Sequence, residues 1–157
     1  MSHAVPEFSL EQLEAAGRIE LDHFTNEDAY ELGTLAASVA LEWGLSLAVD
    51  IVIGDYLVYR ARLGETGPGN DPWLSGKAAA ATHFGEASLL VRRRQEATGV
   101  PFTELPLDHD AIKAHGGSIP IYVDGALCAT ITMSGEPDVV DHEAAAEALR
   151  RFIDGRS

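Results

Sequence analysis

The sequence predicts an α+β fold in which a single antiparallel sheet of about five strands is flanked by helices. Two observations support this prediction. Gly54-Asp55 and Asp124-Gly125 each separate two apolar runs, which is the pattern of a β-hairpin. A long stretch of helical pattern joins the two hairpins, and one sheet covered by helices buries the apolar faces of both. No glycine-rich phosphate motif follows a strand, so a doubly wound nucleotide-binding sheet is not favoured.

Two helices and a short strand are expected before the first hairpin. Ser9 and Gln12 have capping-box spacing at the start of a short helix that ends at Ala16. Residues 18–24 alternate weakly between apolar and polar, which predicts a strand. A longer helix over 25–44 begins at a threonine cap, and its apolar residues recur at helical spacing: Ala29, Leu32, Ala36, Val39 and Trp43.

The hairpins supply four strands, and a helix follows the second one. Apolar runs predict strands over 47–53 and 56–63 in the first hairpin. The second hairpin is expected to pair 118–123 with 126–133. Apolar residues at helical spacing then predict a final helix over 138–152, which can pack on the sheet.

The connection between the hairpins is expected to be mainly helical. Its pattern covers 71–99, with Asp71 as the cap and a bend or break near Gly85. A second, short helix is expected over 108–115. Three consecutive arginines fall in the expected last turns of 71–99, where positive charge suits the helix dipole, with an anion site as the alternative: Arg92, Arg93 and Arg94.

Composition disfavours several classes of function. The chain has 157 residues, which suits one domain, and its 11 basic and 25 acidic side chains give a net charge of −14. That charge repels nucleic acids and anionic membrane surfaces, and no apolar run is long enough to span a bilayer. Cys128 is the only cysteine, so an internal disulfide is excluded. Because the acidic N-terminus lacks the apolar core of a signal peptide, we expect a cytoplasmic protein.

Two segments contain residues whose chemistry suits a ligand. His115 precedes Gly116 and Gly117, whose backbone N–H groups can form either a plain helix cap or a concave anion site. Asp141 and His142 lie in the first turns of the last predicted helix, where the helix dipole disfavours a protonated imidazole. A neutral His142 can ligate a metal or haem iron, or act as a base. Local capping and pairing by these two residues is the alternative.

A third segment places an aromatic ring near a cation. Trp73 and Lys77 are four residues apart on one predicted helix and are neighbours on its surface. They form either a cation–π contact or a ligand wall, unless Trp73 is core and Lys77 extends to solvent. No pair of histidines has the spacing of a helical zinc motif, so a metal site would have to be assembled by the fold. Cys128, inside an apolar run, is expected to be an inert core residue.

Four blocks together resemble a known family. They read FTNEDAYELG at 24–33, NDPWLSGK at 70–77, HGGSIPI at 115–121 and SGEPDVVDHE at 134–143. In this order they resemble an uncharacterised cytosolic family that is grouped with the haem-degrading-type domains, the HbpS-like and GlcG-like proteins. The resemblance covers nearly the whole chain.

The resemblance implies a fold, an assembly and a set of site residues. It implies a profilin-like or sensor-domain-like sheet over 19–154, with 1–18 as a helical extension of the same single domain, and assembly into homo-oligomers. Some relatives bind haem or iron, so either is implied here as a ligand, with His142 or His115 as the metal ligand. Glu136 departs from the family pattern, which has an apolar residue there, and makes an anionic ligand less favourable. The motifs place these residues at a ligand site: Trp73, Lys77, His115, Gly116, Gly117, Asp141 and His142.

Three functions compete at this point. The first is a small-molecule-binding protein of the haem-degrading type, whose pocket the three segments form together. The second is a homo-oligomeric scaffold or adaptor without a ligand, in which the same motifs serve interface packing. The third is a hydrolase or lyase that uses a metal bound by several histidines. Whether the three segments converge on a cavity distinguishes the first from the second.

Overall fold

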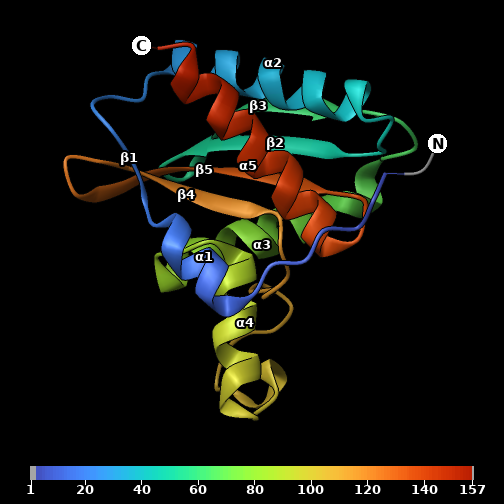
Figure 1. Ribbon diagram of the computed structural model, residues 1–157, viewed down its shortest axis with the longest axis vertical. Helices are drawn as coiled ribbons and strands as arrows, with labels where there is room; N and C mark the ends of the chain where they lie inside the picture. Colours follow the sequence, from blue (N-terminus) through green and yellow to red (C-terminus); the bar gives the residue numbers. More distant parts are fainter. Residues whose placement is uncertain (1–2, 157) are drawn as a thin grey trace.

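The computed structural model describes residues 3–156, which form one five-stranded sheet with helices on both faces (Figure 1). The strand order is β1-β4-β5-β2-β3. In chain order the elements are α1 (Leu10–Ala16), β1 (Ile19–Leu21), α2 (Asn26–Glu42), β2 (Ala48–Ile53), β3 (Tyr56–Arg62), η1 (Pro68–Asn70), α3 (Asp71–Phe84), α4 (Ser88–Thr98), η2 (Phe102–Glu104), β4 (Ser118–Val123), β5 (Ala126–Ser134) and α5 (Asp138–Asp154).

The predicted α+β class is confirmed, with one change to the sheet. β2–β3 and β4–β5 are the two expected hairpins, and β2 pairs antiparallel with β5 between them. β1 pairs parallel with β4, with Ile19 opposite Ile121, so the sheet is mixed and not wholly antiparallel. No hairpin turn links β1 to β4. The direction of β1 in the sheet is therefore set by the path of the chain from α1 to α2.

The helices form two layers. α2 and α5 cover one face of the sheet, and α3 lies against the other, with α1 and α4 beside it (Figure 1). α4 projects away from the sheet, and the connector that follows it returns alongside. The main core fills the space between the sheet and the α2–α5 layer, where the largest fully buried side chains include Leu32, Ile51, Ile131, Leu149 and Phe152.

Local capping hydrogen bonds determine where α1 and α2 begin. The N–H of Gln12 donates to the Ser9 hydroxyl at 3.1 Å, and the N–H of Asp28 donates to the Thr25 hydroxyl at 3.1 Å. In each case the side chain of the third helical residue accepts the N–H of the cap residue. The capping box predicted at Ser9 therefore forms, and the threonine cap predicted at Thr25 forms a second box with Asp28. These bonds satisfy N–H groups that have no partner within the helix.

The helical pattern of 71–99 is interrupted at Gly85, as predicted. Gly85 adopts a left-handed conformation with φ of 74° and ends α3. Asp71 is the first residue of α3 and not its cap, which is Asn70. Within residues 3–156 no helix combines the length and the apolar character needed to cross a bilayer.

The three arginines have a different role from the one expected. They lie in the middle of α4 and not in its last turn, so the helix-dipole interpretation is wrong. Each joins α4 to another segment: Arg92 to Asp138 of α5, Arg93 to the backbone carbonyl of Phe8, and Arg94 to Glu14 of α1.

The short helix expected over 108–115 is absent. A single turn forms, in which the N–H of Ile112 donates to the carbonyl of Asp108. The N–H of Lys113 then donates to the carbonyl of Gly76 in α3 at 2.9 Å. Because this tertiary bond takes a donor that a helix would have used, the segment lies against α3 in an irregular conformation.

Candidate functional site

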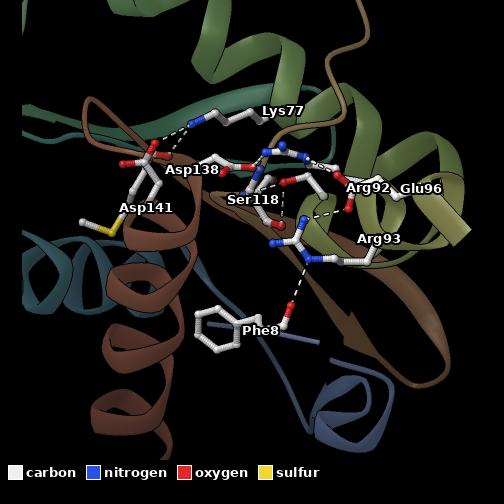
Figure 2. Close-up of polar contacts among 11 residues, drawn as sticks. Phe8, Lys77, Arg92, Arg93, Glu96, Ser118, Asp138 and Asp141 are labelled. Carbon is white, nitrogen blue, oxygen red and sulfur yellow. Dashed lines mark hydrogen bonds and ion pairs between the residues drawn. The ribbon is translucent and has the colours of Figure 1, made fainter. Parts of the chain in front are cut away.

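A buried ion pair joins α3 to the start of α5. The Lys77 ammonium donates to Asp141 Oδ2 at 2.7 Å and to the backbone carbonyl of Met133 at 3.2 Å (Figure 2). The two residues are only 3% and 1% exposed. Asp141 Oδ1 accepts the N–H of Glu136 at 3.0 Å. Both charges are therefore satisfied within the protein, and the Lys77 ammonium is not available to a ligand at the surface.

Trp73 and Lys77 differ strongly in solvent exposure although they are only four residues apart on α3. Trp73 is 42% exposed and lies edge-on to His115, with ring centroids 5.3 Å apart. The cation over its ring is Lys113, whose Nζ lies 5.0 Å from the ring centroid. Two of the three sequence interpretations are therefore wrong: Lys77 is not the cation over Trp73, and the alternative of a core Trp73 with Lys77 extended to solvent does not hold either. Trp73 as part of a ligand wall stays a prediction.

The glycine pair fits closely against the start of α5. The N–H of Gly116 donates to Asp138 Oδ2 at 2.9 Å. Arg92 donates to the same oxygen at 2.6 Å (Figure 2). Burial acts to raise the pKa of Asp138, but the bonds from Gly116 and Arg92 hold it below its ordinary value. The carboxylate of Asp138 thus occupies the place that an external anion would have at Gly116. Asp138 was missed as a site residue, although it lies in the SGEPD block.

Gly117 is required by backbone conformation and by space. Its φ is 137°, which side chains rarely adopt, and a Cβ atom there would lie 2.3 Å from the carbonyl oxygen of Met133. The same Cβ would lie 3.1 Å from the Lys77 ammonium. The second glycine therefore lets the chain approach the Lys77–Asp141 pair.

A cavity of about 840 Å³ lies between α1, β4, α4 and α5, and we call it the first cavity. Apolar side chains form much of its wall, including Leu13, Leu90, Ile119, Leu149 and Ile153. Acidic side chains line it as well. So do three arginines: Arg18, Arg94 and Arg150. Its volume lies within the roughly 300–1,000 Å³ typical of small-molecule sites.

His142 belongs to the wall of the first cavity and is 6% exposed. Burial lowers its pKa to about 4, so the imidazole is neutral at pH 7. The predicted neutral state is thus supported, but its main physical cause is desolvation. The ring meets Phe8 edge-on with centroids 4.9 Å apart, and Nδ1 has no hydrogen-bond partner among the described residues. An unpartnered buried nitrogen carries a free-energy cost that a ligand can remove.

His115 lies at a second cavity, of about 490 Å³, between α4 and the connector 99–115. Trp73 lines the same cavity. The predicted site residues therefore divide among three places: the buried pair with the glycines, the first cavity with His142, and the second cavity with Trp73 and His115. Among residues 3–156 no group of three or more histidine, cysteine, aspartate or glutamate side chains could hold a metal ion.

Two buried groups make opposite contributions to the pH dependence of stability. Burial raises the pKa of Asp141 to about 6, so its protonation stabilises the fold as the pH falls from about 6 toward its ordinary 3.8. The pKa of His142 is lowered from 6.5 to about 4, so the unfolded chain takes up a proton first and the fold loses stability in that range. Each contribution is about 3 kcal/mol at about 1.4 kcal/mol per pKa unit.

We expect the free energy of unfolding of the wild type to change little between pH 6.5 and 4.5, because these contributions oppose each other. His142→Gln removes one of them, so its stability should rise by about 2 kcal/mol relative to wild type over the same range, which covers most but not all of the titration. Urea unfolding at four pH values measures both slopes. If the free energy of unfolding changes with pH in the same way in both proteins, folding does not lower the pKa of His142.

Comparisons with known proteins relate this chain to a family. The family described as haem degrading protein HbpS-like matches residues 24–150. A UPF0303 protein of Streptomyces coelicolor is 41% identical over 138 residues, which cover 87% of each chain.

Solved structures share the fold. The crystal structure of Ybr137w protein has a TM-score of 0.80 and 28% identity, covering 92% of this chain and 88% of that one. The structure of a PduOC:heme complex has a TM-score of 0.68 at 18% identity, covering 80% and 92%, and shows the likeness of fold alone. The family match spans every strand from β2 to β5 together with both buried residues of the α3–α5 pair, and on this basis the chain belongs to the HbpS-like haem degrading protein family.

Proposed function

We propose that this protein binds a small planar molecule in the first cavity, and that haem is the ligand. The observation that carries this proposal is His142, a buried neutral imidazole with an unpartnered Nδ1 in the wall of a cavity of about 840 Å³. Membership of the HbpS-like family supports it, as does a heme complex of the similar fold of PduOC.

The residues of the first cavity fit haem better than they fit bare iron. Leu13, Leu90 and Ile119 offer an apolar surface to a macrocycle. The arginines that line the cavity are already paired with carboxylates of this chain, so one of them would exchange that partner to meet a haem carboxylate. Haem carries its own four nitrogen ligands, so the protein needs to add only one, such as the imidazole of His142. A bare ion needs several protein ligands, and no such group lies among residues 3–156.

Haemin titration followed by absorbance tests the proposal. We expect a saturable Soret shift in the wild type, its loss in His142→Ala, and its retention in His115→Ala. His115 is the matched control, because it is also a histidine of a predicted motif but lines the second cavity. An equal shift in all three proteins would reject His142 as the haem ligand, and no saturable shift in the wild type would reject haem.

Self-association is the second proposed property, and it remains the alternative if no ligand binds. Trp73, Phe84 and Val100 are large apolar side chains that are between 39% and 43% exposed. Exposed apolar groups of this size on one side of a sheet favour contact with another protein surface. The native mass of the samples used for the haemin titration tests it: under the ligand proposal His142→Ala keeps the mass of the wild type.

A further inference from the structure

The second cavity has its own chemistry, separate from that of the first. It is an open hollow lined by α4, by the connector 99–115 and by Trp73 at the start of α3, and its volume is about 490 Å³. Phe102 and Ile112 add apolar surface to the face of Trp73. A cavity of this size suits a ligand with a single aromatic ring.

Lys113 is held in place at this cavity. A Cβ atom at Gly76 would lie 2.6 Å from Cγ and Cδ of Lys113, so the glycine makes room for the lysine stem. The backbone N–H of Lys113 donates to the carbonyl of Gly76, which fixes the start of the side chain. The ammonium is thus positioned over the ring of Trp73 before any ligand arrives.

The Lys113 ammonium has no carboxylate within 4.0 Å among residues 3–156, although the chain has 25 acidic residues. Its polar contact is a distant one, with the carbonyl of His109 at 3.5 Å. By contrast, the acidic groups nearest the cavity are already used: Glu96 pairs with Arg92 and Arg93, and Asp138 pairs with Arg92.

His115 lies beside Lys113 in the wall of this cavity. Burial is the main cause that lowers the pKa of His115; the charge of Asp138 raises it, and the charges of Arg92, Lys77 and Lys113 lower it. A neutral imidazole can accept or donate a hydrogen bond without adding a charge. Trp73, Lys113 and His115 therefore present an aromatic face, a cation and a neutral imidazole side by side.

We propose that the second cavity binds a small aromatic carboxylate. The ring of the ligand packs against Trp73 and Phe102, and its carboxylate accepts hydrogen bonds from the Lys113 ammonium. The pairing supplies the counter-charge that the chain itself does not provide, and the aromatic surface selects a planar body. This site is independent of haem binding, because His142 and the first cavity take no part in it.

Phenylacetate and its uncharged analogue 2-phenylethanol are suitable probes. Trp43→Phe leaves Trp73 as the only tryptophan, so its fluorescence reports on the second cavity. We expect phenylacetate to change that fluorescence saturably and to bind about tenfold more tightly than 2-phenylethanol. This comparison needs no change at the site itself.

Lys113→Met, made in the Trp43→Phe background, keeps most of the stem and removes the charge. It should weaken phenylacetate about tenfold and leave 2-phenylethanol unchanged, with the melting temperature as the check on folding. Equal affinity for phenylacetate with and without Lys113 would overturn the proposal, as would the absence of a saturable signal with phenylacetate. Loss of haem binding in His142→Ala leaves this result unaffected, so the two sites fail or succeed separately.

Discussion

Lys77→Met is expected to lower the free energy of unfolding by about 3–5 kcal/mol at pH 8, among the largest effects of any single substitution in this chain. The variant leaves the carboxylate of Asp141 buried, with the N–H of Glu136 as a remaining donor but without its cation. Removing one partner of a buried pair costs far more than the pair contributes as a whole, because the remaining charge stays desolvated.

Two controls identify this cause. The double variant Lys77→Met with Asp141→Asn carries no buried charge and should recover most of the loss, because the amide oxygen can still accept the Glu136 N–H. The single variant should also regain stability as the pH falls from 8. Lys77 lowers the pKa of Asp141 in the wild type, so without this cation the buried carboxyl has a pKa above the wild-type value of about 6, and its protonation favours the fold. Urea unfolding at pH 8 and pH 5 measures both; a loss that persists in the double variant would point to packing instead.

Gly117→Ala should destabilise the fold by about 3 kcal/mol or more. The substitution combines an unfavourable φ of 137° with a Cβ atom 2.3 Å from the Met133 carbonyl oxygen. The obstacle is backbone, which cannot move aside as a flexible side chain could. Moreover, the N–H of Met133 donates to the carbonyl of Gly117 at 2.9 Å, so the two segments cannot separate without losing a buried bond.

Two other glycines separate strain from collision. Gly125 has a positive φ of 77° but nothing within 4 Å of a Cβ atom, so Gly125→Ala should cost only about 1 kcal/mol. Gly67 has neither problem, and Gly67→Ala should be close to neutral. Thermal unfolding of the three variants ranks them. If Gly117→Ala and Gly125→Ala have the same melting temperature, the contact of the Cβ atom with Met133 adds nothing to the cost of the positive φ.

Local sequence signals were sufficient for most secondary structure. The caps at Ser9 and Thr25 and the stop at Gly85 act through hydrogen bonds and φ preferences that involve residues only a few positions away. Asp124-Gly125 likewise sets a hairpin by itself, with both residues at positive φ. Such features can be predicted from the sequence because their partners lie within the same short segment.

The site residues were only partly predictable for the opposite reason. The motifs identified Lys77, Asp141 and the two glycines. Nothing in their spacing shows that Lys77 and Asp141 form a buried ion pair with each other. Asp138 and Lys113 were missed, since each gains its role from contacts with distant segments: Asp138 with Gly116 and Arg92, and Lys113 with the α3 backbone. An aspartate in the first turn of a predicted helix, inside a recognised motif, was the available signal for Asp138.

The sequence by itself determined the α+β class, the two hairpins, the capped helices and the family resemblance, because these depend on short-range patterns and on motifs read in order. Only the tertiary structure decided the parallel pairing of β1, the irregular path of 108–115, and the division of one predicted site into a buried pair and two cavities. The physical reason is that burial and pairing are properties of segments brought together from afar. Trp73 and Lys77, four residues apart, are respectively 42% and 3% exposed because the elements packed around each of them differ.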